Sequence, residues 1–180
     1  MYKLAPKTMN LIRKTSKGKK FLKLNIGVMI GSQTIMKTFG ENGEVEYENN
    51  VYEIGSITKT FTASLLAKYV YENKVQMNDS ISKFIHELDS DRYYPSLKRL
   101  CTHTSGYTEY QIRGWYSIKF LVDTLFKRYK MIRENPLFMD FNTMLKDIQK
   151  NQMKNKDYKG NYSNFGMGVL GFVLGTVSGL

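Results

Sequence analysis

Residues 52–71 read YEIGSITKTFTASLLAKYVY, and this stretch decides the fold of the chain. Gly55 interrupts the extended run ahead of it, and apolar side chains then recur at helical spacing. These side chains are Phe61, Leu65, Leu66, Tyr69 and Val70. The pattern predicts an amphipathic helix that begins near Ser56 and ends near Asn73.

Ser56 and Lys59 lie almost one turn apart at the start of this helix. Residues three positions apart share a face, with Cβ atoms about 5–6 Å apart. The unpaired N–H groups and the dipole of a helix N-terminus favour negative charge there. The same field, together with burial, disfavours a protonated lysine, so Lys59 could accept the proton of Ser56. The pair predicts a serine nucleophile for acyl transfer.

A simpler interpretation is that Ser56 only caps the helix, as most serines at helix starts do. The spacing Ser-x-x-Lys also occurs at Ser16-Lys19 and at Ser80-Lys83, so the spacing alone is not informative. The first copy lies in a lysine-rich segment, and the second follows a turn-like sequence where a cap is expected. Only Ser56 has a glycine before it and a long apolar helix after it.

The composition is that of one soluble globular domain, with 180 residues, 42% hydrophobic and 24% charged. A single cysteine, Cys101, excludes an internal disulfide and a zinc cluster of cysteines and histidines. The two histidines, His86 and His103, are too few for a metal site without a cluster of carboxylates, and the sequence has no such cluster. We therefore expect neither a metal nor a cofactor.

The net charge of +11 is concentrated near the N-terminus: residues 1–40 hold nine of the 27 basic residues and none of the 16 acidic ones. Residues 1–20 are predicted to form a basic arm. Such an arm could contact nucleic acid, anionic lipid or an anionic wall polymer. Nucleic-acid platforms also interleave aromatic residues, and here only Tyr2 lies in the arm, with Phe21 directly after it. We therefore favour a solvated arm and expect no nucleic-acid partner.

No secretory signal is visible, because the basic start lacks an apolar core and a small-residue cleavage site. No run is long enough for a transmembrane segment. The localisation is thus unknown from the sequence. It is cytoplasmic by default, and periplasmic or extracellular if the N-terminus is that of a trimmed product.

Two β-like runs, residues 21–30 and 32–39, predict a hairpin around Gly31, and a turn at Asn42-Gly43 leads into an extended run. Residues 81–88 are predicted to form a short helix, and residues 117–156 are predicted to be mainly helical with an interruption at Pro136. Residues 165–177 are apolar almost all round and predict a buried helix that is too short to span a bilayer.

Three further motifs follow the Ser56 helix in order: Asn78-Asp-Ser-Ile-Ser-Lys-Phe84, Leu100-Cys-Thr-His-Thr-Ser-Gly106 and Tyr162-Ser-Asn164. With Ser-x-x-Lys, they resemble the serine β-lactamase and penicillin-binding-protein superfamily, in its class C-like branch with D-alanyl-D-alanine carboxypeptidases and esterases. The resemblance covers residues 21–180, which we expect to form a truncated β-lactamase/transpeptidase-like domain. It implies an α+β fold, with a helical region beside an antiparallel sheet that is incomplete because the C-terminal strands are absent.

The resemblance also implies roles for named residues. Ser56 would be the acylated nucleophile, and Lys59 its proton acceptor or relay. Tyr162 would activate the serine or the deacylating water, and Asn164 would donate its side-chain amide to the acyl-amide carbonyl of the substrate. A phenol near ammonium groups can have a lowered pKa and act as a general base.

Tyr-x-Asn also occurs at Tyr47-Asn49 and at Tyr71-Asn73. Tyr71 lies 15 residues beyond Ser56 on one helix, about 22 Å away, and cannot reach it. Tyr47 lacks a following glycine-rich helix, so Tyr162 is the candidate. Its alternative is a buried tyrosine whose hydroxyl caps a turn.

Two other patterns are given structural interpretations. His103 and Ser105 resemble two members of a catalytic triad, but side chains two residues apart in a turn do not normally face each other. We therefore interpret His103 as structural. His86 lies among apolar residues of the predicted helix 81–88, and we expect it to have no chemical role. The spacing G-x-G-x-x-G at Gly166–Gly171 follows no strand, and no ribose-binding acid follows it. We reject a dinucleotide site and expect these glycines to allow close helix packing.

A third motif of the family, Lys-Thr-Gly or His-x-Gly on a late strand, does not follow Tyr162. In the family that strand supplies the second oxyanion donor, and losing one such donor costs about 10²–10³ in rate. Two functions therefore compete. The first is a serine hydrolase acting on β-lactams, D-Ala-D-Ala peptides or small esters, and the second is a catalytically incomplete homologue that acts as a binding or interaction module. An open sheet edge would also permit a homodimer.

Overall fold

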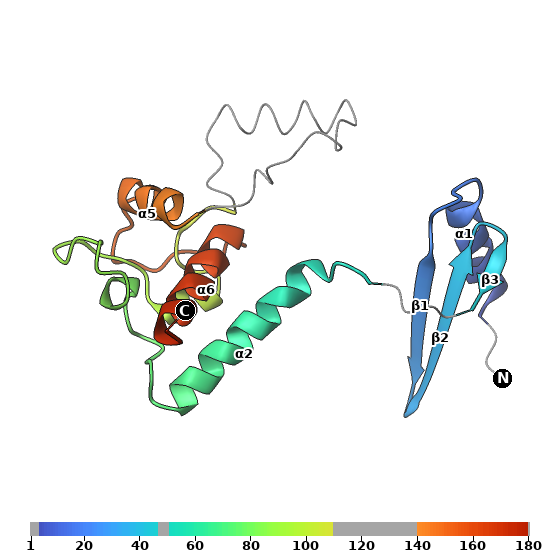
Figure 1. Ribbon diagram of the computed structural model, residues 1–180, viewed down its shortest axis with the longest axis horizontal. Helices are drawn as coiled ribbons and strands as arrows, with labels where there is room; N and C mark the ends of the chain where they lie inside the picture. The colour runs from blue at the N-terminus through green and yellow to red at the C-terminus, as the bar shows by residue number, and fades with distance from the viewer. Residues whose placement is uncertain (1–3, 47–50, 110–139, 180) are drawn as a thin grey trace. The chain divides into compact units, whose positions relative to one another are not determined.

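The computed structural model describes residues 4–46, 51–109 and 140–179. The chain divides into two compact units, Met1–Glu53 and Ile54–Leu180. The described part of the chain is α+β (Figure 1). None of its helices is both long enough and apolar enough to cross a membrane.

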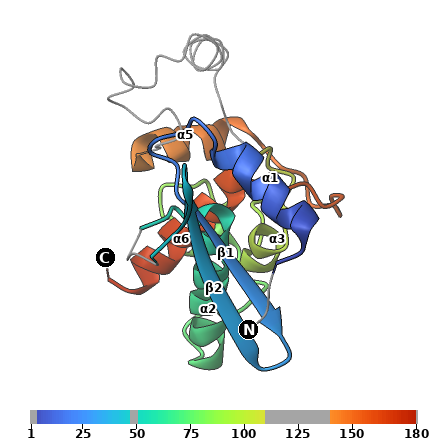
Figure 2. The same cartoon turned by 90° about the vertical axis from the view of Figure 1, so that its right-hand side faces the viewer.

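The first unit combines helix α1 (Pro6–Ser16) with an antiparallel sheet of strands β1 (Leu24–Ile30), β2 (Gln33–Gly40) and β3 (Gly43–Val45), in the order β1-β2-β3. Strands β1 and β2 form a long hairpin in both views (Figures 1 and 2), with Val28 opposite Ile35. Gly31 has a φ of 58°, which only glycine adopts readily, and it closes the predicted turn. The hairpin prediction is confirmed.

Burial in the first unit is limited. Among its described residues, the buried apolar side chains are Ile12 of α1 and Phe39 of β2. Along β1 the side chains of Leu24, Ile26 and Val28 are half-buried, as expected for alternate residues on one face of a strand.

The second unit contains the helices α2 (Thr58–Tyr71), α3 (Leu97–Cys101), α5 (Phe141–Lys150) and α6 (Asn164–Val177), and the 3-10 helices η1 (Gly55–Ile57) and η2 (Ile81–Lys83). Helix α6 contacts both α2 and α3. The core of the unit is one cluster, to which α6 contributes Phe165, Met167, Val169, Leu170, Val173 and Leu174. The predicted Ser56 helix and the predicted buried helix are both confirmed.

The expected helix over residues 81–88 is wrong. The structure has only η2 and turns, although Ile81, Ile85 and Leu88 are buried as their spacing suggested. The backbone forms separate turns instead: the N–H of Ile85 donates to the carbonyl oxygen of Ile81, and the N–H of Leu88 donates only three residues back, to the carbonyl oxygen of Ile85. Of the predicted helical region 117–156, helix α5 is present, and residues 117–139 lie outside the described part.

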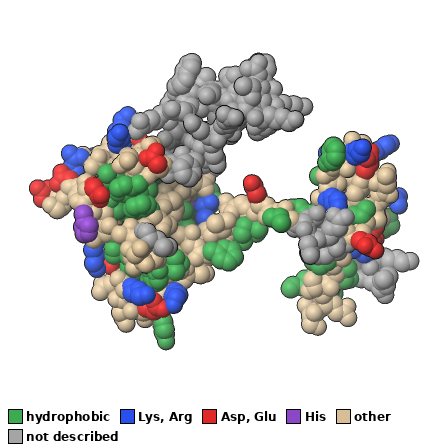
Figure 3. All heavy atoms as spheres, viewed as in Figure 1, with side chains coloured by type: hydrophobic (Ala, Val, Ile, Leu, Met, Phe, Trp, Pro, Cys, Tyr) green, Lys and Arg blue, Asp and Glu red, His purple; other side chains and the backbone are tan. Residues whose placement is uncertain are grey.

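Apolar side chains remain at the surface of both units (Figure 3). At the start of α2 they are Ile54, Ile57 and Phe61, and in the first unit Val51, Phe21 and Met29 are the most exposed. The division between a basic arm (1–20) and a domain (21–180) stays a prediction, and α1 lies within that arm.

Candidate active site

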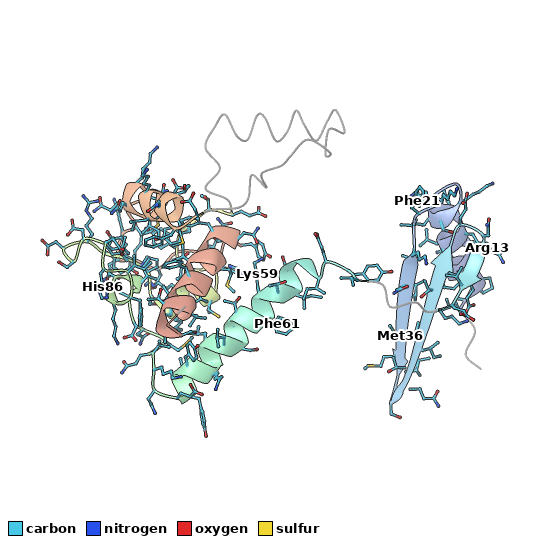
Figure 4. The ribbon with its side chains drawn as sticks, in the orientation of Figure 1. Arg13, Phe21, Met36, Lys59, Phe61 and His86 are labelled. Atoms are coloured by element: carbon cyan, nitrogen blue, oxygen red, sulfur yellow. The ribbon has the colours of Figure 1, made fainter. Side chains whose placement is uncertain are left out.

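Ser56 lies in η1, directly before α2. Gly55 has a φ of 54°, and this left-handed conformation ends the extended run and turns the chain into the helix. The Nζ of Lys59, one turn further, donates a hydrogen bond to the Oγ of Ser56 at 3.2 Å. Figure 4 shows Lys59 on the side of α2 that faces α6, whereas Phe61 points away from it.

Tyr162 completes a cluster of three functional groups. Its hydroxyl lies 2.5 Å from the Oγ of Ser56, across 106 residues of chain. The Nζ of Lys59 lies 4.9 Å from the centroid of the Tyr162 ring. Ser56 is exposed and Tyr162 is 42% exposed, so a small molecule can reach the cluster from solvent. The structure therefore brings together the three residues for which the sequence analysis predicted catalytic roles.

The contacts of Tyr162 also set its acidity. A hydrogen bond from Lys59, and next to it the bond with Ser56, lower the pKa of the phenol below its usual value. Partial burial and the charge of Glu109 act in the opposite direction. A hydrogen bond to the charged form of an acid favours that form, so the tyrosinate is stabilised here. The lowering depends on Lys59 as an ammonium ion.

Tyr162 is held by the residues that follow it. Ser163 is buried, and its Oγ donates to the carbonyl oxygen of Thr108 at 2.7 Å while accepting from the N–H of Gly166 at 2.8 Å. The second bond makes Ser163 the N-cap of α6. Tyr162 therefore stands one residue before a capped helix that is tied to the segment ending at Glu109.

Asn164 is the first residue of α6 and is half-buried. Its backbone N–H donates to the carbonyl oxygen of Glu109 at 3.0 Å. Its side-chain amide makes no hydrogen bond within the described residues. Asn164 thus lies two residues after Tyr162 in the chain, and no hydrogen bond joins Asn164 to Ser56.

The other Ser-x-x-Lys sequences have structural roles. Ser16 is buried, and its Oγ donates to the carbonyl oxygen of Ile12 at 3.1 Å. The Oγ of Ser80 accepts from the N–H of Ser82, so Ser80 caps η2 as predicted. Tyr71 is exposed, and Tyr47 lies outside the described residues.

His103 was expected to be structural, and its contacts with Tyr162 and Ser163 were not predicted from the sequence. Its ring lies against the ring of Tyr162, with the centroids 4.7 Å apart, and its Nδ1 accepts from the N–H of Ser163 at 3.2 Å. Ser105 is buried, and its Oγ accepts from the N–H of Tyr107. No hydrogen bond joins the side chains of His103 and Ser105. His86 is exposed, on a part of the unit away from Lys59 (Figure 4).

The expectation that the glycines of α6 allow close helix packing is only partly correct. Close packing occurs at Gly166, where an added Cβ would lie 3.2 Å from the Oγ of Ser163. At Gly168 and Gly171 an added Cβ would meet nothing within 4 Å, because these positions face away from the core. The expected close packing therefore holds at the start of the helix and not along its exposed side.

Two helix N-termini meet at the cluster, since Ser56 precedes α2 and Tyr162 precedes α6. Neither helix has an acidic residue in its first turn. Both dipoles therefore favour negative charge at the cluster. Within the described ranges, no group of three or more His, Cys, Asp or Glu residues could hold a metal ion. The arrangement suits a proton transfer between two hydroxyl groups beside a cation.

Comparison with known proteins identifies this arrangement. The family model described as Beta-lactamase matches residues 10–180. A curated β-lactamase of Providencia stuartii is 29% identical over 127 residues, which are 70% of this chain and 27% of that protein.

Two solved structures share the fold. A class C β-lactamase has 19% sequence identity and a TM-score of 0.64, over 96% of this chain and 43% of its own. The octameric penicillin-binding protein homologue from Pyrococcus abyssi has 22% identity and a TM-score of 0.65, over 98% of this chain and 40% of its own. The chain thus spans less than half the length of these proteins. The match to the family model over nearly all of its residues shows that the chain belongs to the β-lactamase family.

Proposed function

We propose that this chain carries the nucleophile and general base of a serine hydrolase that acts through an acyl-serine intermediate. One observation carries the proposal: the hydroxyl of Tyr162 lies 2.5 Å from the Oγ of Ser56, and Lys59 contacts both residues. A nucleophile within hydrogen-bond reach of a base, with the base oriented by a third group, is the usual signature of covalent catalysis.

The contacts support Tyr162, rather than Lys59, as the base. Lys59 lowers the pKa of the phenol by donating to it and by its charge, and an ammonium group has no lone pair that could accept the Ser56 proton. In the proposed step the Ser56 proton passes to the tyrosinate oxygen while the Oγ forms a bond to the substrate carbonyl carbon. Tyr162 then gives the proton to the leaving nitrogen or oxygen as the acyl bond breaks, and water later hydrolyses the acyl-serine.

The carbonyl oxygen gains negative charge in this step. The N–H of Ser56 has no hydrogen-bond acceptor within the described residues, so it can donate to that oxygen beside the positive end of α2. For Asn164 we propose that its side-chain amide binds the substrate's acyl-amide carbonyl. The family resemblance implies this role, and a side-chain amide that has no hydrogen bond within the described ranges, two residues after Tyr162, is compatible with it.

The proposed substrates are β-lactams, D-Ala-D-Ala peptides or small esters, all of which present an amide or ester carbonyl to the nucleophile. Support comes from the family and from the two neighbours, of which one is named a β-lactamase and the other a penicillin-binding protein homologue. The alternative, a catalytically incomplete homologue acting as a binding module, retains the fold without a reactive Ser56.

A fluorescent penicillin and a fluorophosphonate test the proposal. Labelling should map to Ser56 by peptide mass spectrometry and disappear in Ser56→Ala. The matched control is Ser80→Ala, which changes the other Ser-x-x-Lys serine of this unit and should leave labelling intact. A folded chain that takes up neither probe, or labelling that survives in Ser56→Ala, would favour the non-catalytic alternative.

A homodimer through the sheet edge is a second part of the proposal. Strand β1 is the first in the order β1-β2-β3, so one of its edges lacks a strand partner within the described residues. Such an edge can pair with a second copy. Sedimentation velocity over a wide range of chain concentration tests this, and a monomer throughout would refute it.

A further inference from the structure

His103 occupies an unusual backbone position. It follows α3 with a φ of 58°. Its N–H donates to the carbonyl oxygen of Leu100 at 3.2 Å, and the next N–H, of Thr104, donates to that of Arg99 at 2.9 Å. This pair of bonds is the Schellman motif, in which the left-handed residue is usually glycine because a side chain is strained there. A non-glycine residue in such a position suggests that its side chain has a role.

The contacts of His103 converge on the residues around Tyr162. Its carbonyl oxygen accepts from the N–H of Asn161 at 2.8 Å, and its Nδ1 accepts from the N–H of Ser163 at 3.2 Å. Between these two bonds, its ring meets the ring of Tyr162 with a centroid distance of 4.7 Å and an interplanar angle of 39°. Both backbone neighbours of Tyr162, and the Tyr162 ring itself, are therefore held by one residue.

A glycine would keep part of this arrangement. It would retain the left-handed turn and the carbonyl bond to Asn161, but it would lose the Nδ1 acceptor and the ring contact. What the imidazole adds is thus directed entirely at Ser163 and Tyr162. We propose that His103 is a positioning residue, whose side chain fixes the Tyr162 ring so that the phenol oxygen stays within reach of Ser56 and Lys59.

The charges around His103 agree with this role. Its Nδ1 accepts a hydrogen bond, so that nitrogen carries no proton. Burial first, and then the charge of Lys59, lower the pKa of the imidazole, and both therefore favour the neutral ring. A neutral ring can pack against Tyr162 without competing with Lys59 for the tyrosinate. Among the described residues, the charged groups that act on these two rings are Lys59 on α2 and Glu109.

Two substitutions separate the contributions of the side chain. His103→Gly removes the acceptor and the ring and keeps the left-handed turn, so the fold should be preserved. His103→Asn keeps an acceptor near the position of Nδ1, tolerates the left-handed conformation and removes the ring. The matched control is Asn73→Gly, because Asn73 (φ 55°) ends α2 with the same pair of backbone bonds at the opposite end from Lys59.

The main measurement needs no substrate. The ultraviolet absorbance of tyrosinate is followed against pH for each protein and for the same protein with Tyr162→Phe, and the difference gives the pKa of Tyr162. The hydrogen bonds with Lys59 and Ser56 are the two largest causes of the lowered Tyr162 pKa, and burial of the phenol opposes them. If the ring moves, the loss of these two bonds raises the pKa by more than better solvation of the phenol lowers it. We expect His103→Gly to return this pKa toward about 10, His103→Asn to lie between, and Asn73→Gly to match the parent. A folded His103→Gly with the parent value overturns the proposal.

The catalytic consequence rests on the proposed function and is measured separately, as the rate of Ser56 labelling. Misplacing a catalytic group can cost about 100-fold, so His103→Gly should slow the labelling step by about 10-fold to 100-fold, with little effect on probe affinity. Equal labelling rates in the parent and in His103→Gly would refute the positioning role and leave the hydrolase proposal intact. An unlabelled parent whose Tyr162 pKa still depends on His103 would refute the hydrolase proposal and support the positioning role.

Discussion

The two units of this chain differ in how much they bury. Of the buried apolar side chains in the described residues, Ile12 and Phe39 belong to the first unit and all the others to the second. The three residues of the candidate site also lie in the second unit, where Tyr162 and Ser56 meet at 2.5 Å. A reactive cluster needs side chains held by packed neighbours. The comparison shows that the candidate site lies in the unit that has the larger buried core, where packed neighbours can hold its side chains.

The largest expected effect concerns the site. Tyr162→Phe keeps the ring and its contact with His103 and removes only the hydroxyl. General-base catalysis is typically worth about 10²–10⁴ in rate, so the rate of Ser56 labelling should fall by about that factor. Its matched control is Tyr71→Phe, which changes the exposed tyrosine of another Tyr-x-Asn sequence in the same unit. Labelling that is unchanged in Tyr162→Phe would remove the base from the proposed mechanism.

A matched pair of leucines tests the difference in burial directly. Leu170 of α6 is fully buried, whereas Leu24 of β1 is half-buried. Leu170→Ala should lower the free energy of unfolding by about 2–5 kcal/mol, as large-to-small changes in a core do. Leu24→Ala should cost about 1 kcal/mol.

Hydrogen exchange of the backbone amides of each unit gives these values separately, because it reports local as well as global opening. The parent amides of α6 should exchange more slowly than those of β1 and β2. If Leu24→Ala costs as much as Leu170→Ala, the first unit is packed as tightly as the second in solution and the comparison is wrong.

The elements that the sequence predicted well are those specified by local patterns. The hairpin follows from alternating apolar residues around Gly31, and helices α2 and α6 follow from long apolar periodicities. Residues 81–88 have the same kind of spacing and are not a helix. There the pattern reports burial alone, because the helical bonds do not continue past Ile85 and the N–H of Leu88 bonds only three residues back. Periodicity could not distinguish these cases, since the same apolar spacing serves a run of buried turns.

The candidate site was predictable to different degrees. The Ser56–Lys59 pair is local, and helical spacing alone puts it on one face. Tyr162 was proposed from a family resemblance, since no local rule brings residues 106 positions apart together. The contact of His103 with Ser163 was not predicted at all. It depends on a left-handed backbone at His103 and on a return of the chain after about 60 residues, and neither leaves a pattern in the sequence.

Two glycines of α6 should sharpen the comparison within the second unit. At Gly168 an added Cβ meets nothing within 4 Å, so Gly168→Ala should stabilise the protein by about 0.4–1 kcal/mol. At Gly166 the Cβ would lie 3.2 Å from the Oγ of Ser163, which is fixed by its bonds to Thr108 and to Gly166 itself. Gly166→Ala should therefore destabilise by about 1–3 kcal/mol. Thermal unfolding checks both, and a shift of the same sign in the two variants would contradict the packing seen here.

The smallest expected effect compares one ion pair from each unit. In the first unit Lys37 bonds to Glu44 across strands β2 and β3, with Nζ 2.6 Å from Oε1 and side-chain exposures of 24% and 51%. In the second, Arg99 meets Asp157 at 3.0 Å, with exposures of 23% and 103%. Each pair keeps at least one partner largely in water, so its coupling energy should be only about 0.2–1 kcal/mol and should shrink at high salt.

Double-mutant cycles measure the two couplings, with Lys37→Met and Glu44→Gln in one cycle and Arg99→Met and Asp157→Asn in the other. Because both pairs are exposed, the difference in burial between the units should not appear here, and the two couplings should agree within about 0.5 kcal/mol. A coupling of Lys37 with Glu44 above about 2 kcal/mol that salt leaves unchanged would mean that the pair is shielded from water. The sheet of the first unit would then be buried in solution, which is the result that would most directly overturn the contrast between the two units.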